Sequence, residues 1–516
     1  IKAPHLTGFA LKLFVWLIET PILRSIILKR QNELLRETVI PENPMFRPEF
    51  PQDPEPGVLV VDEDKDPADR VGSALDCLNP YDPFLYWTIR DYAHAYRSTP
   101  STVVEHIISA VEEPPMPLLI SFSAEEVRKQ AAASTQRFLE GNPLSILDGI
   151  FMAIKDDIDC YPYPSRGATT WFDKVRAVKQ DAVCVSRLRN CGVILIGKAN
   201  MHELGMGTTG NNPNYGTARN PHSPDRYTGG SSSGPAALVA SGLCSAAVGT
   251  DGGGSVRIPS SLCGIVGLKT TYARIDMEGS ICDCGTVEVV SPLAATVEDV
   301  MLVYAAMGGS SIDDKISLNP LPNLSSLRSV RLGKYTEWFN DVHCPDISTK
   351  CEDALNLLEI ILPELQEMRT AHIVSIGSEE LTFDTRFSLA LFRSFSATDY
   401  VSAQRLRRRI MYYHMEVFKK VDIIVTPTTG ITAPKIPPSS LKFGESNYQV
   451  SGYLMRFILA GNLLGLPAIS VPVGHDKEGL PIGLQLIGRP WGEASILRVA
   501  SALEELKRPS LFHDIL

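Results

Sequence analysis

The stretch from Thr228 to Pro259, TGGSSSGPAALVASGLCSAAVGTDGGGSVRIP, constrains the fold of this chain more than any other. Its high content of Gly, Ser and Ala is usual for a flexible linker. However, apolar residues and one acidic residue, Asp251, run through it, and a linker does not need them. We interpret it as two tight glycine turns, at 228–234 and 250–255, with buried segments between them. The sequence therefore predicts a site in which one of four serines is a candidate nucleophile.

The composition describes a folded protein whose main partner is not nucleic acid. Of its 516 residues, 44% are hydrophobic and 21% are charged, as in ordinary globular proteins. The net charge of −10 does not provide the basic surface that phosphate binding requires. The ten cysteines are scattered, and the one close pair, Cys282 and Cys284, lacks the second pair that structural zinc needs. We therefore expect no metal site.

Residues 6–30, LTGFALKLFVWLIETPILRSIILKR, predict two short helices rather than a membrane span, because charged residues interrupt the run and Pro21 divides it. Thr20 would cap the second helix. Residues 1–30 carry five basic residues against one acidic residue, Glu19. Such a segment suits a helix that lies in the interface of an anionic membrane. The alternative is an arm that packs on the protein's own body or on a second subunit, and one helix pair could do both.

The remaining chain has the pattern of an α/β fold. Residues 41–68 are rich in Pro and acidic residues and predict an extended connector. Helical patterns follow near 85–112 and 123–140. From about residue 145, buried strands alternate with amphipathic helices. The run RLRRR at 405–409 predicts an ion-paired or solvated helix face rather than a binding patch.

Two formal motif matches indicate other functions and are rejected on their context. Gly205 to Gly210 spells GxGxxG, but no helix opens within it, as a dinucleotide site would require. Gly230 to Gly234 spells GxSxG, which would make Ser232 the nucleophile of an α/β-hydrolase. That mechanism also needs a histidine, and none of those downstream has a distinctive setting: His372, His414, His475 and His513.

The second glycine turn, TDGGGS at 250–255, is the stronger candidate for chemistry. Consecutive glycines let backbone N–H groups turn inward and bind an anion. If Ser255 attacks a carbonyl, the oxyanion would lie beside the N–H groups of Gly252, Gly253, Gly254 and Ser255. Losing one such donor raises the activation barrier of the reaction by about 3–4 kcal/mol. The alternative is a tight turn without a catalytic role, which does not explain the hydroxyl at its mouth.

A serine nucleophile needs a base, and Lys155 is the candidate. It ends the strongly apolar run Ile150 to Ile154, so burial could keep its amine neutral. The alternative is an ordinary lysine at a strand end, paired with Asp156 or Asp157. The residues alone leave these two interpretations open.

Taken together, these motifs resemble the amidase signature family. The Ser/Gly-rich core is matched from Leu147 to Arg274, and the segments DIIVTPTTGITAP, GNLLGLPAISVPVG and GLPIGLQLIGRP match later blocks. The resemblance covers residues 115–515. It implies an α/β fold with a mixed β-sheet core covered by helices on both faces. We expect a helical arm and connector in residues 1–114 and the catalytic domain in residues 115–516.

The resemblance also assigns roles by position. Lys155 matches the family's base, Ser231 the serine that passes the proton, and Ser255 the acyl-enzyme nucleophile. The matching oxyanion donors are Gly252, Gly253, Gly254 and Ser255. The supporting residues are Asp251, Arg257 and Ser232, and the residues near the bound carbonyl are Gly205 and Met206.

Two positions depart from the family pattern. Ser233 stands where the family has glycine, and we expect this change to be tolerated. Asp157 stands where many members have asparagine. Its charge could oppose the neutral form of Lys155 unless it points elsewhere.

The implied activity is hydrolysis of a carbon–nitrogen bond without metal or cofactor. The N-terminal region most resembles plant members that act on fatty acid amides such as N-acylethanolamines. This implies a lipid amide substrate, a homodimer, and monotopic attachment through residues 6–30 to the cytosolic face of the endoplasmic reticulum or plasma membrane. The alternatives are a soluble amidase, an amidotransferase A subunit that uses glutamine, and an inactive amidase-like scaffold.

Overall fold

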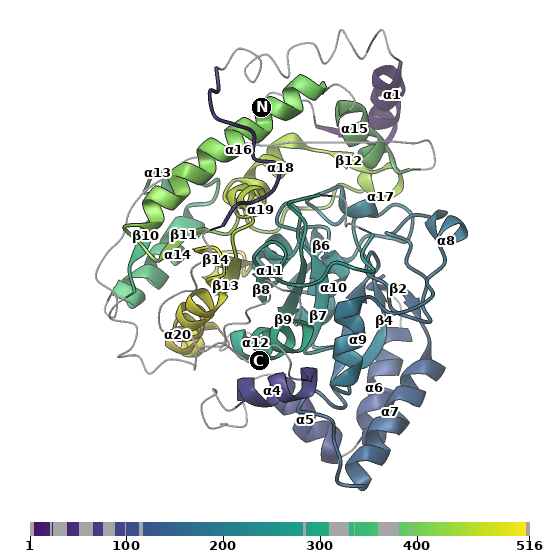
Figure 1. The fold of residues 1–516 in the computed structure, drawn as a ribbon. Helices are drawn as coiled ribbons and strands as arrows, with labels where there is room; N and C mark the ends of the chain where they lie inside the picture. The colour runs from purple at the N-terminus through teal and green to yellow at the C-terminus, as the bar shows by residue number, and fades with distance from the viewer. Residues whose placement is uncertain are drawn as a thin grey trace.

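The computed structural model describes residues 5–20, 23, 39–50, 66–75, 88–98, 100–112, 117–281, 285–308, 330–334, 336–359, 381–392 and 395–511. A mixed sheet of ten described strands forms its centre (Figure 1). In spatial order the strands are β10 (Leu332–Lys334), β11 (Ile423–Pro427), β14 (Pro481–Gly488), β13 (Ala468–His475), β8 (Val266–Lys269), β9 (Val290–Ala294), β7 (Ala246–Thr250), β3 (Phe151–Lys155), β4 (Ile194–Ala199) and β2 (Leu119–Phe122).

The strand directions confirm the predicted mixed α/β fold. The pairs β10–β11, β7–β3 and β3–β4 are parallel, and the other neighbouring strands are antiparallel. β3 and β7 consist entirely of buried residues, as expected of central strands that are covered on both faces. Because β3 and β7 run in parallel, Lys155 and Thr250 end their strands at the same edge of the sheet.

Helices cover the sheet in two groups. α10 (Ser233–Ala240) and α11 (Arg257–Cys263) pack on each other and on the middle strands, while α12 (Val297–Met307), α14 (Pro345–Glu359) and α20 (Glu493–Leu511) form a second group that also contacts the sheet. The other described helices are α4 (Pro67–Leu75), α5 (Ile89–Ser98), α6 (Pro100–Glu112), α7 (Ala124–Leu139), α8 (Phe172–Val175), α9 (Val183–Asn190), η1 (Glu203–Gly205), α13 (Thr336–Asn340), α15 (Phe383–Phe392), α16 (Ala397–Phe418), α17 (Ser440–Phe443), α18 (Tyr448–Met455) and α19 (Leu459–Leu464).

The predicted helical arm contributes to the main core. Side chains from α5 and α6 belong to the same buried apolar cluster as those of β3 and β4. Tyr96 of α5 illustrates this contact: its ring lies 5.9 Å from the ring of Phe151, and its hydroxyl donates to the carbonyl of Ala131 at 2.8 Å. Helix α5 therefore contacts the sheet through Tyr96, while α6 packs between α5 and α7, and α7 contacts β4.

The first helix of the arm, α1 (Gly8–Glu19), packs on the body of the protein through one face. Its neighbours are α15 and α17, and the Phe14 and Phe387 rings lie 5.7 Å apart. Just before it, β1 (Leu6–Thr7) pairs with β12 (Glu445–Ser446). The second helix predicted after Thr20 falls almost wholly outside the described residues. The fully buried side chains of α1 are Leu11, Val15 and Ile18.

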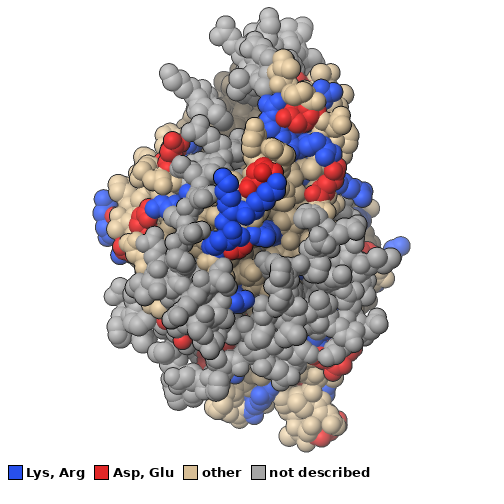
Figure 2. All heavy atoms as spheres, turned by 60° about the vertical axis from the view of Figure 1, so that its left-hand side comes forward, with Lys and Arg blue, Asp and Glu red and all other residues tan. Residues whose placement is uncertain are grey.

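The arginine run at 405–409 lies on α16 and is paired, as its context predicted. Its side chains hold residues 39–50, most of which belong to the predicted connector at 41–68, against the helix. On the face turned forward in Figure 2, Lys and Arg side chains lie with Asp and Glu side chains among them. The run is therefore not a free binding patch. The ion pairs are Arg408 with Glu49 and Arg409 with Glu42.

Among the described residues, no helix is long and apolar enough to cross a membrane. In the same part of the chain, no group of three or more His, Cys, Asp or Glu side chains is arranged to hold a metal ion. Cys282 and Cys284, the closely spaced pair, lie outside the described residues.

A short two-stranded ribbon, β5 (Arg219–Asn220) and β6 (Ser223–Tyr227), precedes the serine-rich turn.

Candidate active site

Lys155 and Ser231 form a buried, hydrogen-bonded pair at the carboxyl end of β3. Their exposed fractions are 0% and 1%. Lys155 Nζ donates to Ser231 Oγ at 2.8 Å. The carbonyl of Ser231 accepts from the backbone N–H of His202 at 3.1 Å, which fixes the turn in place. The structure thus brings the predicted base and the predicted proton-passing serine into contact.

Ser255 lies on the neighbouring turn, directly against the turn that carries Ser231. The N–H of Ser232 donates to the carbonyl of Ser255 at 3.2 Å. Gly230 has a φ of 58°, and a Cβ there would lie 2.9 Å from the same carbonyl oxygen. Only glycine therefore fits at the point where the two turns contact each other. Ser255 is 7% exposed, against at most 1% for Ser231, Ser232 and Ser233. Of the four serines, it is the one that solvent, and hence a substrate, can reach best.

Ser232 and Ser233 have structural contacts. Ser232 Oγ donates to the carbonyl of Thr250 at 3.2 Å and so fastens the first turn to β7. Ser233 begins α10 and is fully buried, with its Cβ against Gly210. A nucleophile must present its hydroxyl to substrate, and neither of these hydroxyls does so.

The histidines that a GxSxG mechanism could use either lie on other elements of the fold or fall outside the described residues. His414 lies on α16 with Nδ1 2.9 Å from the carbonyl of Ile410, and burial lowers its pKa to about 4. His475 ends β13. His372 and His513 lie outside the described residues.

The GxGxxG match at 205–210 is followed by a loop with no helix, which agrees with its rejection as a dinucleotide site.

The carboxylate of Asp251 fixes the conformation of the glycine turn at 250–255 by accepting backbone hydrogen bonds. Asp251 Oδ1 accepts from the N–H of Gly254 at 2.8 Å, and Oδ2 accepts from the N–H of Val256 at 3.1 Å. Gly254, one of the four predicted oxyanion donors, therefore points its N–H at this carboxylate. Within the described part of the chain, no hydrogen bond occupies the remaining three donors, the N–H groups of Gly252, Gly253 and Ser255.

Asp251 is in turn held by a fully buried ion pair. Arg257 Nη2 donates to Asp251 Oδ1 at 3.0 Å, and Arg257 Nη1 reaches Gln485 Oε1 at 2.7 Å on β14. Asn462 Nδ2 adds a bond to Asp251 Oδ1 at 2.8 Å. Burial alone would raise the pKa of Asp251, but the charge and hydrogen bonds of Arg257 bring it below its ordinary value. The predicted supporting pair thus ties the oxyanion turn to the C-terminal half of the sheet.

This geometry gives a first prediction, the replacement of Arg257 by alanine. The change leaves the Asp251 carboxylate buried without its partner, which typically costs about 3–5 kcal/mol of folding free energy. We expect a large fall in the midpoint of thermal unfolding, together with a lower kcat, because the turn loses its anchor. Calorimetry and steady-state kinetics on the same preparation measure both effects. A variant with unchanged stability would contradict the role of this ion pair.

Gly205 and Met206 belong to a loop that is bonded to the serine turn. Gly205 N–H donates to the carbonyl of His202, and Met206 N–H to that of Glu203, both at 3.0 Å. Further along, the carbonyl of Thr208 accepts from the N–H of Gly230 at 2.7 Å. The loop predicted to lie near the bound carbonyl is thus connected to the serine turn at both His202 and Thr208.

Asp157 points at Lys155 rather than elsewhere. Lys155 Nζ lies 3.1 Å from Asp157 Oδ2 and donates to Thr250 Oγ1 at 2.5 Å, while Thr250 Oγ1 donates to Asp157 Oδ2 at 2.8 Å. Lys155 is therefore both a partner of Ser231 and half of an ion pair. Sequence reasoning did not identify Thr250; its only signal is its place directly before Asp251, at the end of a predicted strand.

Asp156, the other acidic residue after Lys155, turns away to a different lysine. Its Oδ1 lies 3.6 Å from Lys198 Nζ, and its Oδ2 accepts from the N–H of Ala168 at 2.9 Å. Burial raises the pKa of Asp156 to about 6, although the charge of Lys198 opposes this. Of the two acidic residues, Asp157 pairs with Lys155 and Asp156 pairs with Lys198.

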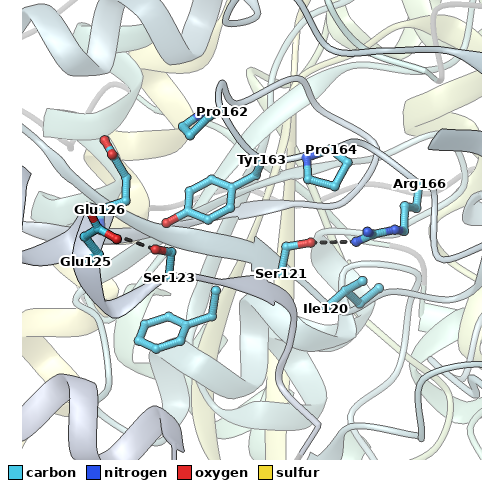
Figure 3. A pocket seen from close by; sticks show the side chains of 10 residues that line it. Ile120, Ser121, Ser123, Glu125, Glu126, Pro162, Tyr163, Pro164 and Arg166 are labelled. Atoms are coloured by element: carbon cyan, nitrogen blue, oxygen red, sulfur yellow. Dashed lines mark hydrogen bonds between the residues drawn. The ribbon is translucent and has the colours of Figure 1, made fainter. Parts of the chain in front are cut away.

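A polar hollow of about 530 Å³ lies elsewhere, beside the edge strand β2 (Figure 3). Arg166 reaches across it to Ser121 Oγ at 2.7 Å, and Ser123 accepts the N–H of Glu126 at the start of α7. Neither Lys155, Ser231 nor Ser255 lines it. The hollow is separate from the candidate catalytic groups.

Comparison with known proteins agrees with this fold and site. A solved amidase structure superposes with a TM-score of 0.70 at 25% identity, covering 81% of this chain and 98% of that chain. The fold and site thus define a hydrolase of the amidase class. The Amidase family model matches residues 103–379 and 376–497, and the chain belongs to this family. It is 67% identical to a fatty acid amide hydrolase of Oryza sativa subsp. indica and 59% identical to one of Arabidopsis thaliana, each over 100% of this chain and 96% of the relative.

Proposed function

We propose that this protein is a fatty acid amide hydrolase, which cleaves the amide bond of a fatty acid amide to release the free acid and an amine. The observation that carries this proposal is the full-length identity of 67% and 59% to two plant proteins of that name. Within this class, N-acylethanolamines are the substrates that we expect, with ethanolamine as the released amine. The expected acylation uses only groups of the chain itself.

In the proposed reaction, neutral Lys155 accepts a proton from Ser231 Oγ, which takes one from Ser255 Oγ. The Ser255 oxygen attacks the amide carbon, and the N–H groups of Gly252, Gly253 and Ser255 stabilise the negative charge on the carbonyl oxygen. The proton then returns through Ser231 to the amine nitrogen as the carbon–nitrogen bond breaks. Water hydrolyses the ester on Ser255 by the same relay, which releases the acid and restores the hydroxyl.

The supporting geometry is the contact of Lys155 Nζ with Ser231 Oγ at 2.8 Å and the packing of the Ser255 turn on the Ser231 turn. A relay through serine lets one base serve both the attack and the departure of a poorly leaving amine. Asp157 Oδ2 lies 3.1 Å from Lys155 Nζ, so an ion-pair contact holds the amine in place as well as its hydrogen bond to Ser231.

A substrate panel tests the proposal. The purified chain should release ethanolamine from a long-chain N-acylethanolamine and should not turn over glutamine. Turnover of glutamine would instead favour an amidotransferase A subunit, and turnover limited to short, water-soluble amides would favour a soluble amidase. An absence of turnover and of labelling by a fluorophosphonate would favour an inactive scaffold.

We further propose that α1 attaches the protein to a membrane surface as a monotopic helix. One face of α1 packs on the protein, but three apolar side chains on the helix remain exposed: Phe9 at 73%, Leu13 at 47% and Trp16 at 64%. Their spacing places them along one side of the helix. Such a face, next to the exposed Lys12, suits the interface of an anionic membrane at the endoplasmic reticulum or plasma membrane.

Replacing Phe9, Leu13 and Trp16 together by serine tests this attachment. Each apolar side chain removed from water contributes about 1.5–3 kcal/mol, so flotation with anionic vesicles should weaken at least about tenfold. Turnover of a short, soluble amide should not change. The matched control replaces Tyr412 and Tyr413, two exposed aromatic residues on α16, and should still float.

The same variant tests the alternative of a homodimer formed through α1. If the wild-type chain does not float but sediments as a dimer, and the triple variant sediments as a monomer, a second copy covers this face instead. A wild-type chain that both floats and dimerises, with the two properties lost together, would assign both roles to α1.

A further inference from the structure

Asn462 is a buried side chain on α19 that contacts the main chain of the glycine turn at 250–255. Its Nδ2 donates to the carbonyl of Asp251 at 2.9 Å, as well as to the Asp251 carboxylate. Its Oδ1 accepts from Arg257 Nη2 at 2.5 Å. Because a guanidinium can only donate, the amide oxygen must face Arg257 and the amide nitrogen must face Asp251. The orientation of the Asn462 amide is therefore fixed by its partners.

The hydrogen bond to the Asp251 carbonyl fixes one peptide group of the turn. This carbonyl and the N–H of Gly252 belong to the same planar unit, and the peptide bond is trans, so the two groups point in opposite directions. A donor held on the carbonyl therefore directs the N–H of Gly252 to the side away from Asn462. Gly252 and Gly253 are half-buried, whereas Gly254 is buried, so the turn is accessible at two of the proposed oxyanion donors.

The N–H of Ser255 is fixed in the same way, but by the main chain. Its peptide group contains the carbonyl of Gly254, which accepts from the N–H of Ile258 at 2.7 Å, at the start of α11. Within the described residues, no main-chain group donates to the carbonyl of Asp251. Asn462 therefore supplies from a side chain what α11 supplies to the peptide group of Ser255 from its backbone.

We propose that Asn462 is a positioning residue for the oxyanion site: it holds the peptide group between Asp251 and Gly252 so that the N–H of Gly252 faces the substrate's carbonyl oxygen. Donors that are already oriented stabilise the charge that develops on this oxygen without reorganising during the reaction. A hydrogen bond on the carbonyl also polarises the peptide group and strengthens its N–H as a donor. The inference rests on the proposed function, in which Ser255 attacks an amide carbon.

The replacement Asn462→Leu tests this inference through a comparison of kcat with KM. Leucine keeps the branched shape of asparagine but has neither its donor nor its acceptor. For a long-chain N-acylethanolamine, we expect kcat to fall by about tenfold to a hundredfold while KM hardly changes, because the donor acts on a charge that forms only in the transition state. The fall should be smaller than for a deleted donor, since the N–H is misdirected rather than removed.

Two inhibitors that carry the same acyl chain separate this effect from general loosening of the site. Ser255 Oγ adds to the carbon of a trifluoromethyl ketone, its proton passes to the relay, and the ketone oxygen becomes an oxyanion. The long-chain alcohol forms no such adduct. In Asn462→Leu, the inhibition constant of the ketone should rise by the same factor by which kcat/KM falls, and that of the alcohol should not change.

Asn220 provides the matched control. It is also buried, and its Nδ2 donates to the carbonyls of Leu262 at 2.8 Å and Tyr227 at 3.2 Å, neither of which belongs to the turn at 250–255. Asn220→Leu should lower the midpoint of thermal unfolding, as Asn462→Leu does, but should keep the wild-type kcat and the wild-type inhibition constant of the ketone.

An unchanged kcat in Asn462→Leu, or equal weakening of the ketone and the alcohol, would overturn the inference and leave Asn462 as a structural residue. If Asn462→Leu does not fold, Asn462→Ala, which removes the amide without adding apolar bulk, decides by the same measurements. A selective loss of ketone affinity in that variant supports the inference, and any other result overturns it.

Failure of the inference can be told apart from failure of the proposed function. If Ser255→Ala still turns over the lipid amide, the proposed mechanism is wrong whatever Asn462 does. If wild-type turnover and inhibition by the ketone both depend on Ser255 while Asn462→Leu keeps the wild-type kcat, only the role of Asn462 is wrong.

Discussion

Replacing Ser255 by alanine is expected to lower kcat/KM for a fatty acid amide by at least about 10⁴-fold, because no other group replaces a lost nucleophile. Ser255 is the most exposed of the four serines in the glycine turns, and its own N–H is one of three donors on its turn to which no hydrogen bond is made within the described residues. Reaction with a fluorophosphonate probe, followed by peptide mapping, measures the same property independently of substrate choice. Labelling should fall on Ser255 in the wild-type chain and disappear in the variant.

The matched control for this experiment is Ser232→Ala. Ser232 lies in the GxSxG match, but its hydroxyl is bonded to the carbonyl of Thr250 at 3.2 Å. We expect this variant to keep its label and most of its activity, with a small loss of stability from one missing hydrogen bond, about 1 kcal/mol. Probe found on Ser232, or labelling that survives Ser255→Ala, would refute the assignment.

The second large effect is expected for Lys155→Met. Methionine fills much of the same buried space but cannot accept a proton, so the relay from Ser255 through Ser231 has no end point. General-base catalysis typically contributes about 10²–10⁴-fold, and we expect a loss of this size near neutral pH. Steady-state kinetics and the rate of fluorophosphonate labelling should fall together, because both depend on the activated nucleophile.

Lys198 provides the matched control for Lys155. It is also fully buried, stands opposite Ile154 on the adjacent strand β4, and donates to Ser165 Oγ at 2.7 Å. Lys198→Met should destabilise the fold without removing the label from Ser255. Near-normal rates in Lys155→Met would mean that another group is the base.

The local chemistry of the site could be predicted from the sequence because it depends on residue types at short spacing. The strand that ends at Lys155 is visible as an apolar run, and β3 ends at that residue. The glycine turns are visible because consecutive glycines allow a backbone that other residues resist. The arginine run on α16 predicts an ion-paired or solvated face rather than a binding patch, and its ion-pair partners Glu42 and Glu49 come from the acidic connector.

Contacts between distant segments could not be predicted in this way. Asp157 had two possible orientations, and only the parallel pairing of β3 with β7 places Thr250 where it holds this carboxyl beside Lys155. Asn462 lies in a segment that matches the family, but the segment alone gives it no role. It reaches Asp251, 211 positions earlier, because β13, the strand after α19, pairs with β8, and strand register depends on the whole sheet rather than on neighbouring residues.

The sequence by itself determined the family, the mixed α/β class and the identity of the candidate base and nucleophile, because these follow from patterns within short segments. The tertiary structure decided which hydrogen-bonding and ionisable groups of the site lie next to one another. It turned the N–H of Gly254 to Asp251, directed Asp157 at Lys155 and brought Asn462 to the carbonyl of Asp251. The physical reason is that desolvation and charge pairing depend on what surrounds a group in space, and residues more than a hundred positions away supply those surroundings, as Asn462 does for Asp251 and Gln485 for Arg257.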